Sequence, residues 1–100
     1  MTEKTIIASW PKNSRETLMV KLDSYKGQAI VDCRAWYAGS DGSLKPGRGG
    51  LTVSIRHLPA LAAAFARGLT AAKDMGLISD DDLLKAESET RHQSHIGGEI

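Results

Sequence analysis

Cations and aromatic rings follow one another in the middle of the chain in a pattern that suits binding to a flexible polyanion. Arg34 precedes the aromatic pair Trp36 and Tyr37 within a strand-like segment. A loop rich in glycine and proline follows, and its cations Lys45 and Arg48 have no acid beside them in the sequence. Single-stranded nucleic acid offers phosphates to cations and unpaired bases to flat rings. The pattern therefore predicts a surface that binds single-stranded nucleic acid.

Each of these side chains also has a structural interpretation. Arg34 can bind a phosphate or form an ion pair with Asp32, which lies two residues away on the same face of the strand. Trp36 and Tyr37 are adjacent, so a regular strand points them to opposite faces. One ring is then expected to stack on a base while the other packs, unless a β-bulge re-aims them. From the residues alone, both interpretations of Arg34 stay open.

Two-residue alternation in the first half of the chain predicts an antiparallel sheet. Apolar residues share one face of residues 16–22. A tight turn at residues 24–27 and an Asp-Gly turn within residues 39–42 predict two hairpins. The expected strands are residues 16–22, residues 28–37, a short strand that begins at Leu44 and is interrupted at Pro46, and residues 51–55, while residues 5–8 resemble a strand start before Pro11.

The period of apolar residues lengthens to three and four after residue 57, which is typical of an amphipathic helix. Pro59 suits its first turn, and Gly76 is expected to end it. One helix on a small sheet leaves this apolar face without a partner, so we expect it to form a dimer interface. The expected interface residues are Leu58, Leu61, Phe65 and Leu69.

The C-terminal quarter is acidic and polar. Ser79 is expected to cap a short helix through about Ala86, because the acids that follow it favour a helix N-terminus. The aperiodic stretch from Glu87 to Ile100 predicts a mobile tail. The chain is thus divided into an N-terminal segment (1–15), a binding domain (16–76) and a short helix with an acidic tail (77–100).

Composition bounds the class of protein. One hundred residues form one domain at most, and a domain this small gains from oligomerisation because its own core is limited. No apolar run approaches the ~20 residues of a membrane span, and the N-terminus is too polar for a secretory signal. A single cysteine excludes an internal disulfide. We expect a cytoplasmic protein, nucleoid-associated if bacterial.

The net charge of +1 conceals an asymmetry. Residues 10–56 carry eight Lys or Arg and four acids, whereas residues 57–100 carry four Lys or Arg and seven acids. The distribution of charge, and not its sum, decides where an anion binds. A charge split of this size is also ordinary surface variation, so it does not locate a binding surface by itself.

Patterns typical of enzymes are missing from the sequence. No glycine-rich phosphate loop precedes a helix in the required form. Cys33 lies in mid-strand without a Cys-x-x-Cys partner and is expected to be a small buried hydrophobe. His92 and His95 lack a further ligand for zinc. We expect no catalytic residues, no metal and no cofactor.

The ordered set of motifs resembles the DNA-binding domain of the transcriptional coactivator family called positive cofactor 4. That pattern begins with an aromatic-Lys-Gly turn, continues through an Asp-x-Arg strand with trailing aromatics and a glycine turn, and ends in a Lys-Pro-Gly-basic loop. The resemblance covers Glu16 to about Lys73. The matching residues are Tyr25-Lys26-Gly27, Asp32-Cys33-Arg34, Trp36-Tyr37, Asp41-Gly42 and Lys45-Pro46-Gly47-Arg48-Gly49-Gly50.

The resemblance implies a four-stranded curved antiparallel sheet followed by one long helix, in a homodimer that binds single-stranded or unwound DNA with little sequence preference. It places Tyr25 at the family's base-contacting phenylalanine and Tyr37 at its tryptophan, and it favours the phosphate role for Arg34 over the ion pair. Family cations are replaced at Leu18, Asp23, Gln28 and Gly49, which implies weaker, more salt-sensitive binding. Lys21 and Arg15 are expected to compensate for this loss in part. The expected nucleic-acid-binding residues are Lys21, Tyr25, Lys26, Arg34, Trp36, Tyr37, Lys45 and Arg48.

Two alternatives stay open. The acidic C-terminal region can dock a protein partner while the sheet merely stabilises the dimer. RNA is a further ligand, because stacking and phosphate contacts do not separate it from DNA. The resemblance implies a role in transcription, replication or repair, with that machinery as partner. A serine-rich regulatory tail is absent, which suits a compact bacterial or phage member.

Overall fold

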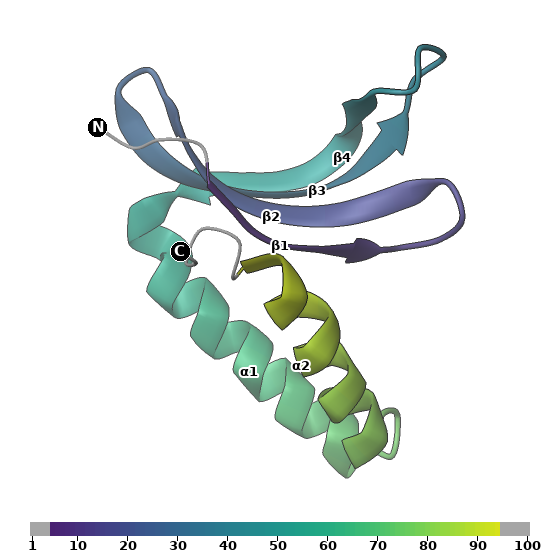
Figure 1. Cartoon of the computed structure of the whole chain (residues 1–100). Coiled ribbons are helices and arrows are strands. Elements are labelled where there is room, and N and C mark those ends of the chain that lie inside the picture. The colour runs from purple at the N-terminus through teal and green to yellow at the C-terminus, as the bar shows by residue number, and fades with distance from the viewer. Residues whose placement is uncertain (1–4, 95–100) are drawn as a thin grey trace.

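The chain forms a four-stranded antiparallel sheet and a pair of helices that extends from one of its faces (Figure 1). This computed structural model describes residues 5–94, with side chains described up to Thr90. The strands are β1 (Thr5–Pro11), β2 (Glu16–Tyr25), β3 (Gln28–Ala38) and β4 (Leu44–Ser54), which are neighbours in that order. A short 3-10 helix η1 (Ile55–His57), then α1 (Leu58–Asp74) and α2 (Asp80–Ser94), complete the fold. The expected curved sheet followed by a long helix is confirmed.

Both predicted hairpin turns are present. Tyr25 pairs with Gln28, and the two residues between them have left-handed backbones, with φ of 52° at Lys26 and 81° at Gly27. This combination defines a turn whose twist matches that of the flanking strands. In the β3–β4 connection, Gly42 has φ of 88°, and the N–H of Gly39 donates to the carbonyl of Ser43.

The interruption expected at Pro46 is wrong, because β4 runs without a break from Leu44 to Ser54. β4 is an edge strand, where a proline without an N–H removes no ladder hydrogen bond. The pairing with β3 is irregular between Arg34 and Trp36, which lie opposite Gly50 and Pro46. More residues of β4 than of β3 span this interval, so the chain bulges at Gly47–Gly49.

β1 extends the sheet to the N-terminal side of the expected domain start at residue 16. It pairs antiparallel with β2 from Thr5 to Pro11, where Pro11 lies opposite Thr17. Like β4, β1 is an edge strand, so the proline at its end is tolerated.

The register divides the sheet into two faces. Residues 18, 20 and 22 of β2 share a face with Val31, Leu51 and Val53. Leu51 and Val53 border a hollow with Leu61 and Ala64 of α1, so this apolar face is the one turned to the helices. The opposite face carries Met19, Asp32 and the other residues of their register, and we call it the polar face.

The helix ends match the predicted signals. Gly76 has φ of 77°, its N–H donates to the carbonyl of Lys73, and the next N–H donates to that of Ala72. At the start of α2, the Ser79 hydroxyl accepts from the N–H of Asp82, whose carboxylate accepts from the N–H of Ser79. This reciprocal pair satisfies amide groups that a helix start leaves free.

The expected end of the second helix at about Ala86 is wrong, because α2 continues to Ser94. Glutamate, arginine and glutamine in this stretch are good helix formers. Tertiary support is also present, since α2 packs against β1 (Figure 1). Residues 95–100 of the expected tail lie outside the described part of the chain.

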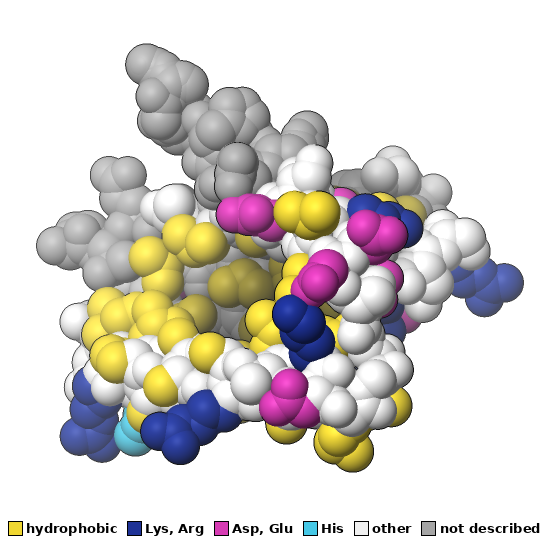
Figure 2. Space-filling model, turned by 90° about the horizontal axis from the view of Figure 1, so that it is seen from below, with side chains coloured by type: hydrophobic (Ala, Val, Ile, Leu, Met, Phe, Trp, Pro, Cys, Tyr) yellow, Lys and Arg dark blue, Asp and Glu magenta, His cyan; other side chains and the backbone are white. Residues whose placement is uncertain are grey.

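The apolar face of α1 is left largely uncovered in the single chain. Leu58 and Leu61 are half-buried, whereas Phe65 is 67% and Leu69 is 47% exposed. Figure 2 shows apolar side chains gathered on the helix-bearing side of the molecule. Apolar area of this kind usually marks an interface.

Candidate nucleic-acid interface

Arg34 is the centre of a hydrogen-bonded cluster on the polar face. Its Nη2 lies 2.9 Å from Oδ1 of Asp32, and its Nε donates to both oxygens of that carboxylate at 3.0 and 3.1 Å. Nη2 also donates to the hydroxyl of Thr52 at 2.9 Å, and Nη1 donates to the carbonyl of Gly47 at 2.9 Å. Four of the five guanidinium N–H groups are thus engaged. Arg34 thus forms the ion pair with Asp32, which was the less favoured of its two expected roles.

Asp32 is held ionised by this cluster. Burial by itself opposes the charge, but hydrogen bonds from Arg34 and then Thr52 outweigh it and hold the pKa of the Asp32 carboxyl below its ordinary value. The residue is 6% exposed. A buried carboxylate with these partners joins β3 to β4 through side chains as well as through the ladder.

The same cluster shapes the bulge of β4 that carries Arg48. A Cβ added at Gly47 would lie 2.8 Å from the carbonyl oxygen of Ala35, and one at Gly50 would lie 2.6 Å from Cβ of Arg34. Glycine therefore lets β4 approach β3 closely enough for Arg34 to reach the Gly47 carbonyl. Arg48 itself is exposed, and no ion pair engages it among the described side chains.

Trp36 and Lys21 lie on the polar face beside the Arg34 cluster. The Lys21 ammonium lies 4.7 Å from the centre of the Trp36 ring and 3.9 Å from a carboxylate oxygen of Asp23. The Lys21 side chain is 11% exposed, so most of it is already covered. The indole Nε1 of Trp36 is buried without a hydrogen-bond partner among the described residues.

Tyr25 and Lys26 form an exposed pair at the β2–β3 turn. The Tyr25 residue is 63% exposed, and the Lys26 ammonium lies 5.4 Å from the centre of its ring. An accessible π-face next to a cation is the combination that a base and its phosphate require.

Tyr37 and Lys45 lie at the other end of the sheet, on its helix-facing side. They are directly opposite one another in the β3–β4 pair, and Tyr37 is 44% exposed. Lys45 was expected to have no acid beside it. Its ammonium nevertheless lies 4.0 Å from an Asp41 carboxylate oxygen. Both partners are well exposed, so this ion pair is weak and yields readily to a phosphate.

The predicted residues therefore form three groups and not one cluster. Tyr25 with Lys26 is separated from Tyr37 by nine residues of β3, about 30 Å at ~3.3 Å per residue. The Arg34 group lies between them on the polar face. The β2–β3 turn is at one end of the sheet and the β1–β2 and β3–β4 connections are at the other (Figure 1).

Thr52 and Arg15 lie in this region but outside the expected set of binding residues, and only Arg15 had been considered, as partial compensation for lost family cations. Thr52 lies directly opposite Asp32 in the register, and the alternation Leu-Thr-Val-Ser-Ile of residues 51–55 gave no sign of that position before the pairing was known. Arg15 is exposed in the β1–β2 connection and borders a hollow with Tyr37. The signal available for Arg15 was its position in a turn between two strands.

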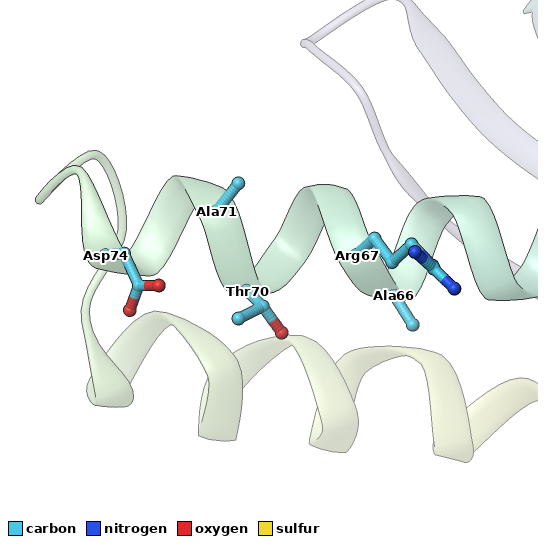
Figure 3. A pocket seen from close by; sticks show the side chains of 5 residues that line it. All are labelled: Ala66, Arg67, Thr70, Ala71 and Asp74. Carbon is cyan, nitrogen blue, oxygen red and sulfur yellow. The ribbon is translucent and has the colours of Figure 1, made fainter.

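A further hollow lies on α1, away from the sheet. Its lining residues come from one helix and its volume is about 390 Å³ (Figure 3). Ala66, Thr70 and Asp74 recur every four residues along it, and the hollow offers no aromatic ring.

The described residues carry no sign of a metal site or of a membrane-spanning helix. No three His, Cys, Asp or Glu residues there are placed to hold a metal ion. His92 and His95 lie beyond the described side chains. Cys33 is half-buried, and burial followed by the charge of Asp32 raises the pKa of its thiol. No helix in the described part is long and apolar enough to cross a membrane.

Comparison with known proteins identifies the family. The model of the family Transcriptional Coactivator p15 (PC4) matches residues 12–64, which is more than half of the chain. The chain belongs to the transcriptional coactivator p15 (PC4) family. Family membership supports a DNA-binding, coactivator-like role. No curated protein matches the chain.

Two solved structures show where this PC4 family member lies among its relatives. A PC4 homolog from Burkholderia pseudomallei is 25% identical with a TM-score of 0.56, covering 71% of this chain and 98% of its own. A bacteriophage T5 homolog of the eukaryotic coactivator PC4, implicated in recombination-dependent DNA replication, is 14% identical with a TM-score of 0.59. It covers 87% of this chain and 96% of its own, and at this identity it shows the fold alone.

Proposed function

We propose that this PC4 family member is a homodimer that binds single-stranded or unwound DNA without enzymatic activity and with little sequence preference. The observation that carries the proposal is the set of exposed cation–aromatic pairs at both ends of the sheet. Tyr25 lies beside Lys26, and Tyr37 lies opposite Lys45. A chain of unpaired nucleotides is flexible enough to reach both ends, whereas the stacked bases of a duplex cannot reach the rings.

The sheet cations divide into phosphate ligands and structural residues in this proposal. Arg48, Lys26 and Lys45 are exposed, so they supply charge to the phosphates. Arg34 and Lys21 are largely engaged within the sheet, so they contribute long-range potential and position their neighbours. One N–H of Arg34 remains for a direct contact.

The exposed face of α1 supports the proposed dimer. Its exposed apolar residues Phe65 and Leu69 need a cover that the single chain does not supply. A second copy offers the same apolar surface, as a two-fold interface requires. The dimer also supports the proposed binding, because two copies double the number of cation–aromatic pairs available to one strand.

The salt dependence of binding tests the phosphate role. The affinity for a single-stranded oligonucleotide should fall with salt at a slope of about −0.7 per phosphate neutralised. Arg48→Ala should make the slope shallower and weaken all sequences alike, because phosphates carry no sequence information. The matched control is Arg67→Ala on α1, which should leave the slope unchanged. Equal effects of the two substitutions would contradict the assignment of Arg48.

A protein-interaction role is the second candidate function. The exposed acids that follow Ser79, together with exposed Leu77 and Leu84, favour it. It predicts that the protein fails to bind any oligonucleotide at low salt.

A further inference from the structure

A polar hollow at the open end of the sheet joins the β1–β2 connection to the end of β3. It has a volume of about 670 Å³, within the range of small-molecule sites of ~300–1,000 Å³. It lies on the helix-facing side, because Tyr37 and Glu16 are direct partners in the β2–β3 pair on that face. The residues that border it are Asn13, Ser14, Arg15, Glu16 and Tyr37.

The hollow is bordered by one negative side chain, Glu16, and one positive side chain, Arg15. Oε1 of Glu16 accepts from the Asn13 amide at 3.0 Å and lies 3.5 Å from the Lys12 ammonium. The hydrogen bond from Asn13, and then the charge of Lys12, lower the pKa of the Glu16 carboxyl, so Glu16 is ionised at neutral pH. The guanidinium of Arg15 has no partner among the described side chains.

The Asn13 side chain fixes the backbone of the connection. Its Oδ1 accepts from the N–H groups of Arg15 and Glu16, both at 2.8 Å. These two amides are therefore not available to a ligand, and recognition in the hollow falls to the side chains of Arg15, Glu16 and Tyr37.

We propose that this hollow is a nucleotide subsite that prefers cytosine to thymine: Tyr37 stacks on the base, Arg15 binds a flanking phosphate, and Glu16 accepts a hydrogen bond from the exocyclic amino group. The inference rests on the proposed function and gives that binding surface a base preference. Because a carboxylate repels phosphate, Glu16 is assigned to the edge of the base and not to the sugar-phosphate backbone. Cytosine presents an amino donor to a carboxylate, whereas thymine presents a carbonyl oxygen that Glu16 repels.

Paired homopolymers test the preference. The affinities of the full chain for dC12 and dT12 oligonucleotides are compared at pH 8 and constant salt. The wild type should bind dC12 more tightly by roughly two- to tenfold, the net worth of one hydrogen bond. Glu16→Gln should bring the ratio close to one, because an amide can donate to thymine as well as accept from cytosine. Arg15→Ala should weaken both ligands and keep the ratio.

Control variants separate the subsite from general charge effects. Arg67→Ala removes the same charge from α1 and should leave both affinities close to those of the wild type. A wild type with no preference, a ratio that Glu16→Gln does not change, or equal losses from Arg15→Ala and Arg67→Ala would overturn the subsite while single-strand binding stands. Failure to bind either oligonucleotide would overturn the proposed function itself.

Discussion

Arg34 shows how a side chain that looks like a phosphate ligand can act through its neighbours. Its guanidinium binds Asp32, Thr52 and the carbonyl of Gly47. The last of these contacts holds the β4 bulge that presents Arg48. The sequence offered both interpretations of Arg34, and the choice depended on whether β4 brings acceptors within reach. The register between β3 and β4 depends on residues far apart in the sequence, so residue spacing along one strand does not predict it.

Substitution of Asp32 tests this positioning role. Removal of an acid from a DNA-binding surface normally raises affinity for a polyanion. Asp32→Asn should instead lower single-strand affinity, because Arg34 loses its anchor and the bulge loses its support. It should also lower the free energy of unfolding by about 2–4 kcal/mol, as expected when one partner of a buried charged pair is removed. Both quantities can be measured by fluorescence anisotropy and urea denaturation.

Asp23→Asn is the matched control, because it removes the same charge from the same face of the sheet. It should leave affinity unchanged or raise it. A rise in affinity for Asp32→Asn as well would mean that Asp32 acts only as an unfavourable charge.

At the scale of elements, local signals predicted the turns and helix ends well. Gly27, Gly42 and Gly76 have the left-handed backbones that their turns and cap require, and Ser79 caps α2. The edges of the sheet were harder to predict. A proline suggested a break in β4, yet an edge strand tolerates it, and edge position depends on the order of the whole sheet. The length of α2 was underestimated because its support comes from β1.

The contact between α2 and β1 makes the C-terminal segment part of the fold. Removal of residues 87–100 should therefore lower the melting temperature, because it removes the second half of α2. Removal of residues 95–100 alone leaves α2 intact and should change the melting temperature little. Thermal denaturation followed by circular dichroism measures both. Equal melting temperatures for the two truncated chains would show that the end of α2 adds no stability.

At the scale of the whole molecule, the single chain has a small core. Its few buried side chains lie in the sheet, with Val31 at 5% and Met19 at 7% exposure, and the described part of α1 contains no buried residue. A small domain with so little core is expected to gain stability from a partner. The proposed dimer was suggested by the apolar period of α1, and its proposed two-fold arrangement comes from the family resemblance.

Phe65 on α1 tests the dimer. Light scattering at micromolar concentration should give a mass near twice the 10.8 kDa of one chain. Phe65→Asp should dissociate or unfold the dimer, since it would bury an unpaired charge. The control Leu84→Asp changes a similarly exposed residue of α2 and should leave the mass unchanged. A wild-type mass of a single chain would contradict the proposed dimer.

The proposed binding of single-stranded DNA depends on whether unpaired bases reach the exposed rings of the sheet. The most direct measurement compares the affinities of wild type and Tyr37→Ala for one single-stranded oligonucleotide and its duplex at the same salt. The wild type should bind the single strand more tightly than the duplex. Tyr37→Ala should lose about 1–3 kcal/mol per stacked base on the single strand, with little change on the duplex. Equal affinity for both forms, or equal losses on both, would contradict base stacking as the basis of binding.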